Sequence, residues 1–284
     1  MKKRMRISSF LCIFLLVFSL LTGCHAGSPA QSDDSTEEKD YTIEITEDIQ
    51  NIIDRGYLIV GVKTDVPGFG YYDTQTKEYS GMEIDLSYQI AAKIFDTTPE
   101  KAKTEQLVQF EKATVDNRST LLVEHSVDLV IATFTITKDR QETFLFSDSY
   151  YSDYIGLMVK KDRSNESSLG TNAITSIQKL DGKKIGVAKN ADTRTHMLRY
   201  FRQRSYNIAP YFVEYSTYPQ LYKALKNGDI DAFAVDTSIL NGYLDDSLTI
   251  LPDRFSEQKY GVAASKDCEG LINAVNVVID EYHY

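Results

Sequence analysis

Residues 127–140 read Val-Asp-Leu-Val-Ile-Ala-Thr-Phe-Thr-Ile-Thr-Lys-Asp-Arg, and this stretch decides the predicted fold. Its first six residues form a mainly apolar run of strand length, which is typical of a strand buried on both faces. Thr137 follows as a helix N-cap, with Arg140 three residues later. Hydroxyls, backbone N–H groups and a guanidinium therefore gather at the carboxyl end of one strand, where open α/β sheets bind ligands. The arrangement suits an anion, most simply a carboxylate, but a capped turn with a solvent-facing Arg140 fits the residues equally well.

Residues 1–23 have the pattern of a secretory signal peptide. Residues 1–6 carry four positive charges and no negative one, and residues 7–21 form an apolar run too short for a comfortable membrane span. The closing Leu21-Thr22-Gly23-Cys24 resembles a bacterial lipobox, in which Cys24 becomes the lipid-modified first residue of the mature protein. Acyl chains on Cys24 would tether the protein to the membrane without spanning it. We therefore expect an extracytoplasmic protein that is lipid-anchored to the bacterial cell membrane; the alternative is an ordinary signal peptide with a chance cysteine.

The chain after the signal peptide is strongly acidic. It keeps 27 of the 31 Lys and Arg residues against 41 Asp and Glu, a net charge of −14. This charge argues against nucleic acid as a partner and makes any group of cations in a cleft informative. Cys12 leaves with the signal peptide and Cys24 is lipid-bound, so Cys268 has no intrachain disulfide partner. Residues 24–47, rich in Ser, Asp and Glu at first, are predicted to be a disordered tether.

A helix–turn–strand unit occurs twice in the chain. Val127-Asp128 superposes on Ile230-Asp231, so that Thr133 falls opposite Asp236. Two similar α/β units with polar residues at the same strand end suggest two lobes that face each other across a cleft, although ordinary β-α-β patterning would give the same coincidence. The predicted strands are 57–62, 127–132, 144–148, 154–159, 184–189 and 231–236, the predicted helices are 49–55, 82–95, 115–124, 221–230 and 271–282, and 161–171 is a predicted surface loop.

Six motifs occur in the order found in a known family. They are Gly61-Val62-Lys63-x-Asp65-x-Pro67-x-Phe69-Gly70, Gly81-x-Glu83-x-Asp85-Leu86, the stretch from Asp128 to Arg140, Phe146-Ser147-x-x-Tyr150, Leu180-x-Gly182-Lys183-Lys184-Ile185-Gly186-Val187 and Asp231-Ala232-Phe233-x-x-Asp236. The ordered set resembles the bacterial extracellular solute-binding proteins of the polar amino-acid type, family 3, which feed ABC importers. The resemblance covers about residues 48–284.

The resemblance implies an α/β, two-lobed periplasmic-binding-protein fold of the type II, venus-flytrap kind, with two crossing hinge strands. Lobe 1 would comprise residues 48–153 and the returning segment 261–284, and lobe 2 would comprise residues 154–260. The implied partners are an amino-acid ligand and the permease subunits of an ABC transporter. We expect a monomer with no cofactor and no metal ion.

The resemblance also implies a clamp for an amino acid. Arg140 matches the arginine that holds the ligand's α-carboxylate, helped by Thr135. Asp236 matches the carboxylate that receives the α-ammonium, with Thr133 beside it. The physics agrees, because a zwitterion that leaves water must find both charges paired.

The loop 190–193 matches the helix start of lobe 2 that closes over the ligand's carboxylate. Relatives usually carry Gly-Ser-Thr-like residues there, and Asp192 departs from that pattern. Either the Asp192 side chain contributes to ligand binding, or only Thr193 and the backbone do.

Lys63 and Arg118 indicate the class of ligand. Together they resemble the subset of the family that binds glutamate or aspartate, and Tyr218 matches a ligand-facing tyrosine of that subset. A second ligand carboxylate in a closed cleft requires compensating positive charge, which these two cations would supply. Two solvated surface cations are the alternative for the residues themselves. Glutamine or another polar neutral amino acid is the alternative for the ligand, because an amide needs hydrogen bonds but no cations.

Two further classes of protein use this fold, enzymes and sensor domains. The sequence shows no Ser/His/Asp or Cys/His arrangement, and His125 and His196 are expected in helices as ordinary surface or core residues, so we predict no catalytic residue and no enzyme. A sensor domain of a receptor would be followed by a transmembrane helix, of which the sequence shows no sign. An extracytoplasmic binding protein is therefore the predicted function.

Overall fold

The computed structural model describes residues 41–161 and 173–284. The predicted signal peptide, Cys24, residues 24–40 of the predicted tether and nearly all of the predicted 161–171 loop lie outside the described residues. No helix within the described ranges is long and apolar enough to cross a membrane.

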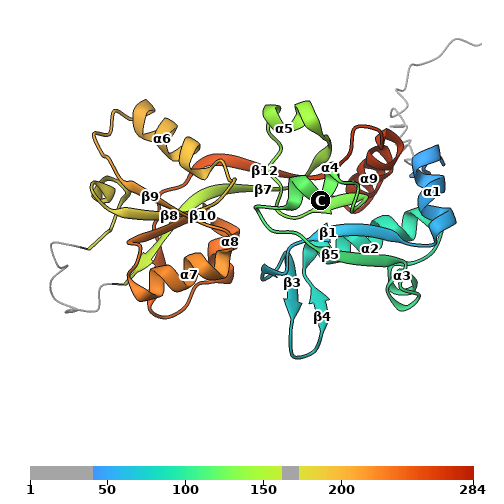
Figure 1. The fold of residues 1–284 in the computed structure, drawn as a ribbon, viewed down its shortest axis with the longest axis horizontal. Coiled ribbons are helices and arrows are strands. Elements are labelled where there is room, and N and C mark those ends of the chain that lie inside the picture. Colours follow the sequence, from blue (N-terminus) through green and yellow to red (C-terminus); the bar gives the residue numbers. More distant parts are fainter. Residues whose placement is uncertain (1–40, 162–172) are drawn as a thin grey trace, which may run out of the picture. The chain divides into compact units, whose positions relative to one another are not determined.

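A large mixed sheet organises these residues, in the order β5-β1-β6-β12-β7-β10-β8-β9, with β11 beside β7 (Figure 1). Strands β5, β1 and β6 are parallel and are called the β1 group; β10, β8 and β9 are parallel and are called the β8 group. Between the two groups run β7 and β12, which pair antiparallel with each other and with their neighbours. The strand bounds are β1 Leu58–Val62, β5 Val108–Lys112, β6 Leu129–Ile131, β7 Leu145–Lys160, β8 Lys184–Ala188, β9 Tyr211–Tyr215, β10 Ala232–Asp236, β11 Leu248–Ile250 and β12 Phe255–Ala264.

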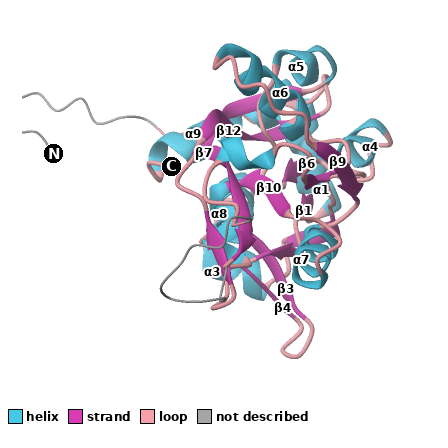
Figure 2. Cartoon of the chain, turned by 90° about the vertical axis from the view of Figure 1, so that its left-hand side faces the viewer, coloured by secondary structure: helices cyan, strands magenta, loops and turns pink. Residues whose placement is uncertain are grey.

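Helices cover both groups of strands (Figure 2). Helices α2, α4 and α9 contact the sheet around the β1 group, and α6, α7 and α8 contact it around the β8 group. The bounds are α1 Glu47–Arg55, α2 Met82–Ile94, α3 Pro99–Thr104, α4 Arg118–Val123, α5 Lys138–Thr143, α6 Thr193–Gln203, α7 Tyr218–Asn227, α8 Thr237–Gly242 and α9 Glu269–Glu281, with a 3₁₀ turn at Ile177–Leu180. A small second sheet consists of β2 Asp65–Val66, β3 Gly70–Asp73 and β4 Glu78–Ser80.

Strand β6 is buried on both faces, as predicted, and β10 proves to be buried on both faces as well. In β6, Leu129 and Ile131 pack into one core cluster while Val130 packs into another with Leu122 of α4. In β10, the odd and even positions likewise enter different clusters, one with α7 and the other with α6. Two-sided burial explains why these strands are continuous apolar runs, and it fixes where each one ends.

The start of α2 depends on one glycine. Gly81 adopts a φ of 115°, and a Cβ at this position would lie 2.2 Å from the carbonyl oxygen of Phe69. Met82 and Glu83 donate their backbone N–H groups to the carbonyls of Gly68 and Phe69. Only glycine permits this approach, and it sets the position of the first turn of α2, which carries Glu83.

The prediction of separate strands at 144–148 and 154–159 is wrong, because Leu145–Lys160 is one strand of 16 residues. The polar residues between them resemble a break, but Ser149, Ser152 and Asp153 all pair with β12, and register shifts accommodate the irregularity. The helix predicted at 115–124 begins only at Arg118, since Thr114 and Asn117 close a hydrogen-bonded turn ahead of it.

The predicted lobe boundaries fall inside β7 and β12, the two strands that connect the β1 and β8 groups. The division into lobes 48–153 with 261–284 and 154–260 stays a prediction. At the N-terminal side, residues 41–46 precede the first helix, which begins at Glu47, one residue before the predicted start of lobe 1.

Candidate ligand-binding site

The chain turns sharply where β6 ends. Thr133 adopts a φ of 44°, which is unusual for a β-branched residue and costs backbone energy. Its neighbours hold it there: the Thr133 N–H donates to Oε1 of Glu83 at 2.5 Å, and its carbonyl accepts from Nη1 of Arg118 at 3.0 Å. Arg118 also donates to the carbonyl of Ala132 at 2.9 Å. The strand end is thus held by a carboxylate on one side and a guanidinium on the other.

Two guanidinium groups share one aromatic ring at this strand end. The guanidinium carbons of Arg118 and Arg140 lie 4.3 and 4.7 Å from the centroid of the Phe134 ring. Thr137 caps α5 as predicted, accepting from the N–H of Arg140 at 3.3 Å, and Nη1 of Arg140 donates to the carbonyl of Thr135 at 2.7 Å. Burial lowers the pKa of Arg140 to about 10, so the group is still a cation at neutral pH.

Asp236 ends β10 and is nearly buried. Its carboxylate accepts a 2.5 Å hydrogen bond from the hydroxyl of Tyr260. Burial raises the pKa of Asp236 from 3.8 to about 7, while this hydrogen bond and the charges of Arg118 and Arg140 act in the opposite direction. The two poles predicted from the sequence, Arg140 on α5 and Asp236 at the end of β10, therefore lie close enough for each to act on the pKa of the other.

Lys63 is completely buried. Its ammonium pairs with Asp65 at 2.9 Å and lies 4.6 Å from the ring centroid of Tyr218. Burial lowers the pKa of Lys63, and Asp65 and Glu83 partly oppose that shift. Tyr218 is also buried, at the first turn of α7, and Arg118 has about 4% of its surface exposed. Lys63, Arg118 and Tyr218 thus lie together in the interior, where the alternative of two solvated surface cations does not hold.

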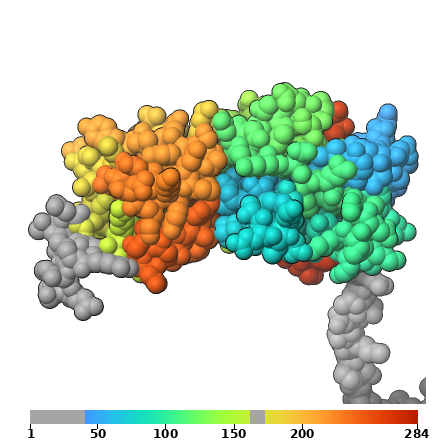
Figure 3. Space-filling view, turned by 60° about the horizontal axis from the view of Figure 1, so that its bottom comes forward, coloured from blue at the N-terminus to red at the C-terminus, as the bar shows by residue number. Residues whose placement is uncertain are grey.

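The loop before α6 approaches the end of β6 from the β8 group. Asp192 pairs with Nη2 of Arg140 at 2.9 Å, and the buried Thr193 begins the helix. Two residues earlier, the side-chain amide of Asn190 donates to Asp116 at 2.6 Å, joined by Lys189 at 3.2 Å. The space-filling view shows the orange and the cyan-to-green segments in contact on the face that it presents (Figure 3).

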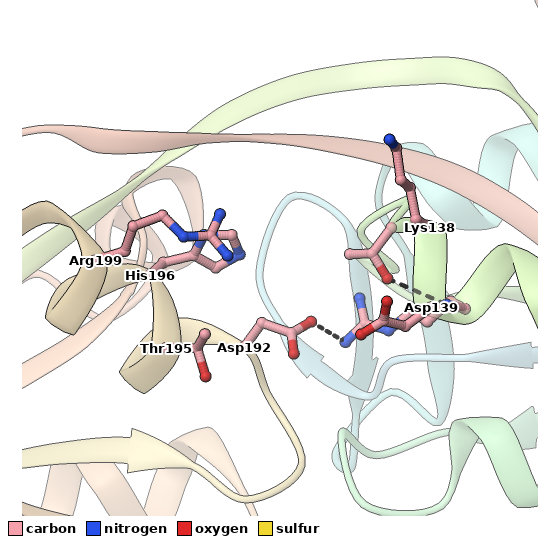
Figure 4. A pocket seen from close by; sticks show the side chains of 8 residues that line it. Lys138, Asp139, Asp192, Thr195, His196 and Arg199 are labelled. Carbon is pink, nitrogen blue, oxygen red and sulfur yellow. Dashed lines mark hydrogen bonds and ion pairs between the residues drawn. The ribbon is translucent and has the colours of Figure 1, made fainter.

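A cavity of about 350 Å³ opens beside this ion pair (Figure 4). In Figure 4, Lys138 and Asp139 come from α5, while Thr195, His196 and Arg199 come from α6 on the facing side. Thr137, Arg140 and Asp192 complete its lining. His196 is held by a 2.7 Å hydrogen bond between its Nδ1 and the hydroxyl of Ser256.

Comparison with known proteins assigns this arrangement to a family. The profile of "Bacterial extracellular solute-binding proteins, family 3" matches residues 58–283. The chain belongs to this family.

Similar proteins include a glutamine-binding protein of Geobacillus stearothermophilus, 28% identical over 92% of this chain and 94% of its own length. A glutamate-binding protein, GluB of Corynebacterium glutamicum, is 24% identical over 81% of this chain and 75% of its own. A periplasmic binding protein from Brucella ovis with glutathione bound has a TM-score of 0.72, with 24% identity and coverage of 84% of this chain and 73% of its own. This structural likeness confirms the predicted periplasmic-binding-protein fold.

Members of this family bind a solute rather than convert it, which agrees with the prediction that the protein is not an enzyme. Within the described ranges no group of three or more His, Cys, Asp or Glu side chains is placed to hold a metal ion.

The structure adds residues to this candidate site that the sequence analysis did not select. Glu83 is fully buried and accepts from Tyr150 at 2.7 Å as well as from Thr133, and burial raises its pKa. The sequence could have indicated Glu83, because this charged residue falls on the apolar face of α2. Tyr260 and Phe134 carried no such signal, because their contacts with Asp236 and with Arg118 join separate elements of the fold. The sequence analysis did select Thr135, whose hydroxyl donates to Oε1 of Gln258 in β12 at 3.0 Å.

Proposed function

We propose that the protein binds an α-amino acid as a zwitterion and delivers it to an ABC importer. The observation that supports this most directly is the joint placement of the Arg140 guanidinium, on α5 after β6, and the Asp236 carboxyl group, at the end of β10, close enough for each to act on the pKa of the other. Arg140 would hold the α-carboxylate with the help of Thr135, and Asp236 would hold the α-ammonium beside Thr133. Thr193 would add its backbone N–H and hydroxyl at the start of α6.

The energetics favour such a ligand. A carboxylate and an ammonium that leave water lose their hydration, and only paired, hydrogen-bonded partners compensate that loss. Arg140 presents a planar guanidinium that suits a carboxylate, and its shared contact with Phe134 restricts its orientation. The similar proteins, named for binding glutamine and glutamate, point to the same ligand class.

Within that class we propose glutamate or aspartate as the ligand. Lys63 and Arg118 are both buried close to the clamp, and Tyr218 packs on Lys63. Burial raises the pKa of Glu83, which disfavours its charged form and so reduces the negative charge that it offers to these two cations. A side-chain carboxylate of the ligand would supply negative charge there.

Glutamine is the second candidate, and two contacts favour it. Lys63 already pairs with Asp65, and Arg118 already donates to two backbone carbonyls. If Glu83 is charged, these pairs leave no cation for a second ligand carboxylate, and an amide side chain then fits without added charge.

Calorimetry of the purified mature protein against the twenty amino acids tests the proposal. We expect glutamate or aspartate to bind at least about tenfold more tightly than glutamine, a margin of about 1.4 kcal/mol. Arg118→Ala should remove that margin, and Lys63→Met is a second variant that leaves the carbonyl contacts of Arg118 in place. Tighter binding of glutamine by the wild type would favour the second candidate, and no binding of any amino acid would overturn the clamp.

We also propose that acyl chains on Cys24 anchor the protein outside the cytoplasmic membrane, close to its permease partner. The lipobox-like residues 21–24 support this. In bacteria, the wild type should partition into detergent and Cys24→Ser should yield a soluble, unlipidated protein. A wild type that already partitions into the aqueous phase would contradict the anchor.

A further inference from the structure

Asp192 occupies the N-cap position of α6 without acting as a cap. Aspartate at an N-cap normally accepts a hydrogen bond from a backbone N–H in the first turn of the helix. The Asp192 side chain makes no such bond. It reaches instead to the β1 group and pairs with Arg140 at 2.9 Å, with 46% of the side chain exposed.

This ion pair uses the donors that the proposed ligand needs. Nη1 of Arg140 donates to the carbonyl of Thr135, and Nη2 faces Asp192. A carboxylate binds a guanidinium best through two parallel N–H donors. A ligand α-carboxylate on Arg140 would therefore share Nη2 with Asp192, and two carboxylates at one guanidinium repel each other.

The N-terminus of α6 offers the Asp192 carboxylate an alternative set of hydrogen-bond donors. The first N–H groups of α6 lie next to it in the chain, and a carboxylate at a helix N-terminus is stabilised both by capping and by the helix dipole. Leaving Arg140 would thus give Asp192 a hydrogen bond in place of an ion pair.

We propose that Asp192 is an internal competitor for the ligand's α-carboxylate, exchanging between Arg140 and the N-terminus of α6. This rests on the proposed function, in which Arg140 binds that carboxylate. Asp192 then lowers affinity for ligands that carry an α-carboxylate and has little effect on ligands that carry an α-carboxamide. When no ligand is bound, the ion pair with Asp192 also keeps the Arg140 guanidinium oriented toward the site.

Asp192→Asn tests the competition, because asparagine caps a helix about as well as aspartate but carries no charge. L-glutamate and isoglutamine, its α-carboxamide, are titrated into the wild type and the variant by calorimetry. L-glutamine and L-glutamine amide form a second pair of probes. We expect Asp192→Asn to bind both α-carboxylates roughly three- to fivefold more tightly, the size of a partly solvated ion pair. Binding of both α-carboxamides should stay within about twofold.

Three control variants separate competition from other effects. Asp192→Ala removes the charge and also the side chain that would cap α6 once the ligand is bound, so its gain should be smaller than that of Asp192→Asn. Asp139→Asn removes a carboxylate that lines the same cavity, and Asp116→Asn weakens the contact to the same loop through Asn190. Neither should tighten binding.

The outcomes are distinct. Unchanged or weaker glutamate and glutamine binding by Asp192→Asn, with the wild type binding normally, would overturn the competitor role and return Asp192 to a ligand or closing contact. Equal gains for α-carboxylates and α-carboxamides would overturn it too. A wild type that binds none of the amino acids overturns the proposed function itself.

Discussion

The end of β6 and the end of β10 both contribute to the proposed site but are constructed differently. At β6, Thr133 takes a left-handed conformation and is bonded through its N–H to Glu83 and through its carbonyl to Arg118. At β10, Asp236 leads directly into α8 with ordinary backbone angles, and the hydroxyl of Tyr260 is its main partner. The first strand end stores strain inside a network of charges, and the second presents one carboxylate with few bonds.

This difference suggests that the charges at one strand end serve mainly the fold, and those at the other serve mainly ligand binding. The residues around Thr133 use their charges largely to hold one another, so their loss should affect folding. Asp236 has the Tyr260 hydroxyl as its main partner, and the Arg140 guanidinium pairs with the partly exposed Asp192, so the loss of either should affect mainly ligand binding.

The largest effect is expected at the two poles of the clamp. Arg140→Ala and Asp236→Asn should each abolish detectable amino-acid binding, because either change leaves one pole of a buried zwitterion unpaired, a loss of about 3–5 kcal/mol. Calorimetry measures the loss. Arg199→Ala, which removes an exposed arginine from the neighbouring cavity, is the matched control and should bind nearly as the wild type does. Near-normal affinity in either clamp variant would refute the assignment.

A smaller effect, on folding, is expected from Glu83. Glu83→Leu leaves the Thr133 N–H and the Tyr150 hydroxyl without their acceptor, and we expect the free energy of unfolding to fall by about 2–4 kcal/mol. Denaturant titration followed by circular dichroism measures it. Glu83→Gln keeps an acceptor oxygen in place and should lose less. If both variants were as stable as the wild type, the end of β6 would not depend on this network.

The pH dependence of Asp236 should have opposite signs for binding and for stability. With its pKa near 7, Asp236 gains the charge that an ammonium requires as the pH rises from 5 to 8, so affinity should increase by up to about tenfold per pH unit and then level off. The stability of the free protein should change the other way. Because the folded-state pKa lies above the ordinary value of 3.8, the contribution is fully present below about pH 4 and is lost as the pH rises through 7.

Thermal unfolding and calorimetry across this pH range check both signs. Asp236→Asn should flatten the stability profile. A binding profile that is flat from pH 5 to 8 would mean that Asp236 is ionised throughout, and its burial would then matter less than its bond to Tyr260 and the charges of Arg118 and Arg140.

The smallest effect is expected from the exposed contact between the two strand groups. Asp116→Ala removes the partner of Asn190 and Lys189, and we expect affinity for all ligands to fall by less than about 1 kcal/mol, with ligand preference unchanged. A change in the ratio of glutamate to glutamine binding would show that this contact reaches the ligand.

The sequence predicted those parts of the fold that depend on local pattern. The buried strand after Val127 and the cap at Thr137 are confirmed, and the helix predicted at 221–230 is found at Tyr218–Asn227, before Gly228, since apolar runs, capping residues and glycine act within a few residues. The continuity of β7 through Ser149–Asp153 was missed, because it depends on pairing with β12 more than a hundred residues later. The edge strand β9 and the small sheet formed by β2, β3 and β4 carried too weak a pattern to be predicted.

The candidate site likewise contains residues that the sequence could predict and contacts that it could not. Arg140, Asp236, Lys63 and Arg118 stand at strand or helix ends and could be selected from the chain alone. The shared contact of two guanidiniums with Phe134 could not, because it requires knowing that α4 and the end of β6 meet. The ion pair between Arg140 and Asp192 likewise joins two elements that nothing in the local sequence connects.

The tyrosines around Asp236 give the protein a useful optical property. The chain contains 19 tyrosines and no tryptophan, so its ultraviolet emission comes from tyrosine alone. Tyr151 stacks on Tyr260 with ring centroids 5.8 Å apart, and Tyr260 in turn touches Asp236. A single Tyr151→Trp substitution would therefore place the chain's one indole beside the ammonium pole, where its fluorescence would follow ligand arrival in real time against a background free of other indoles.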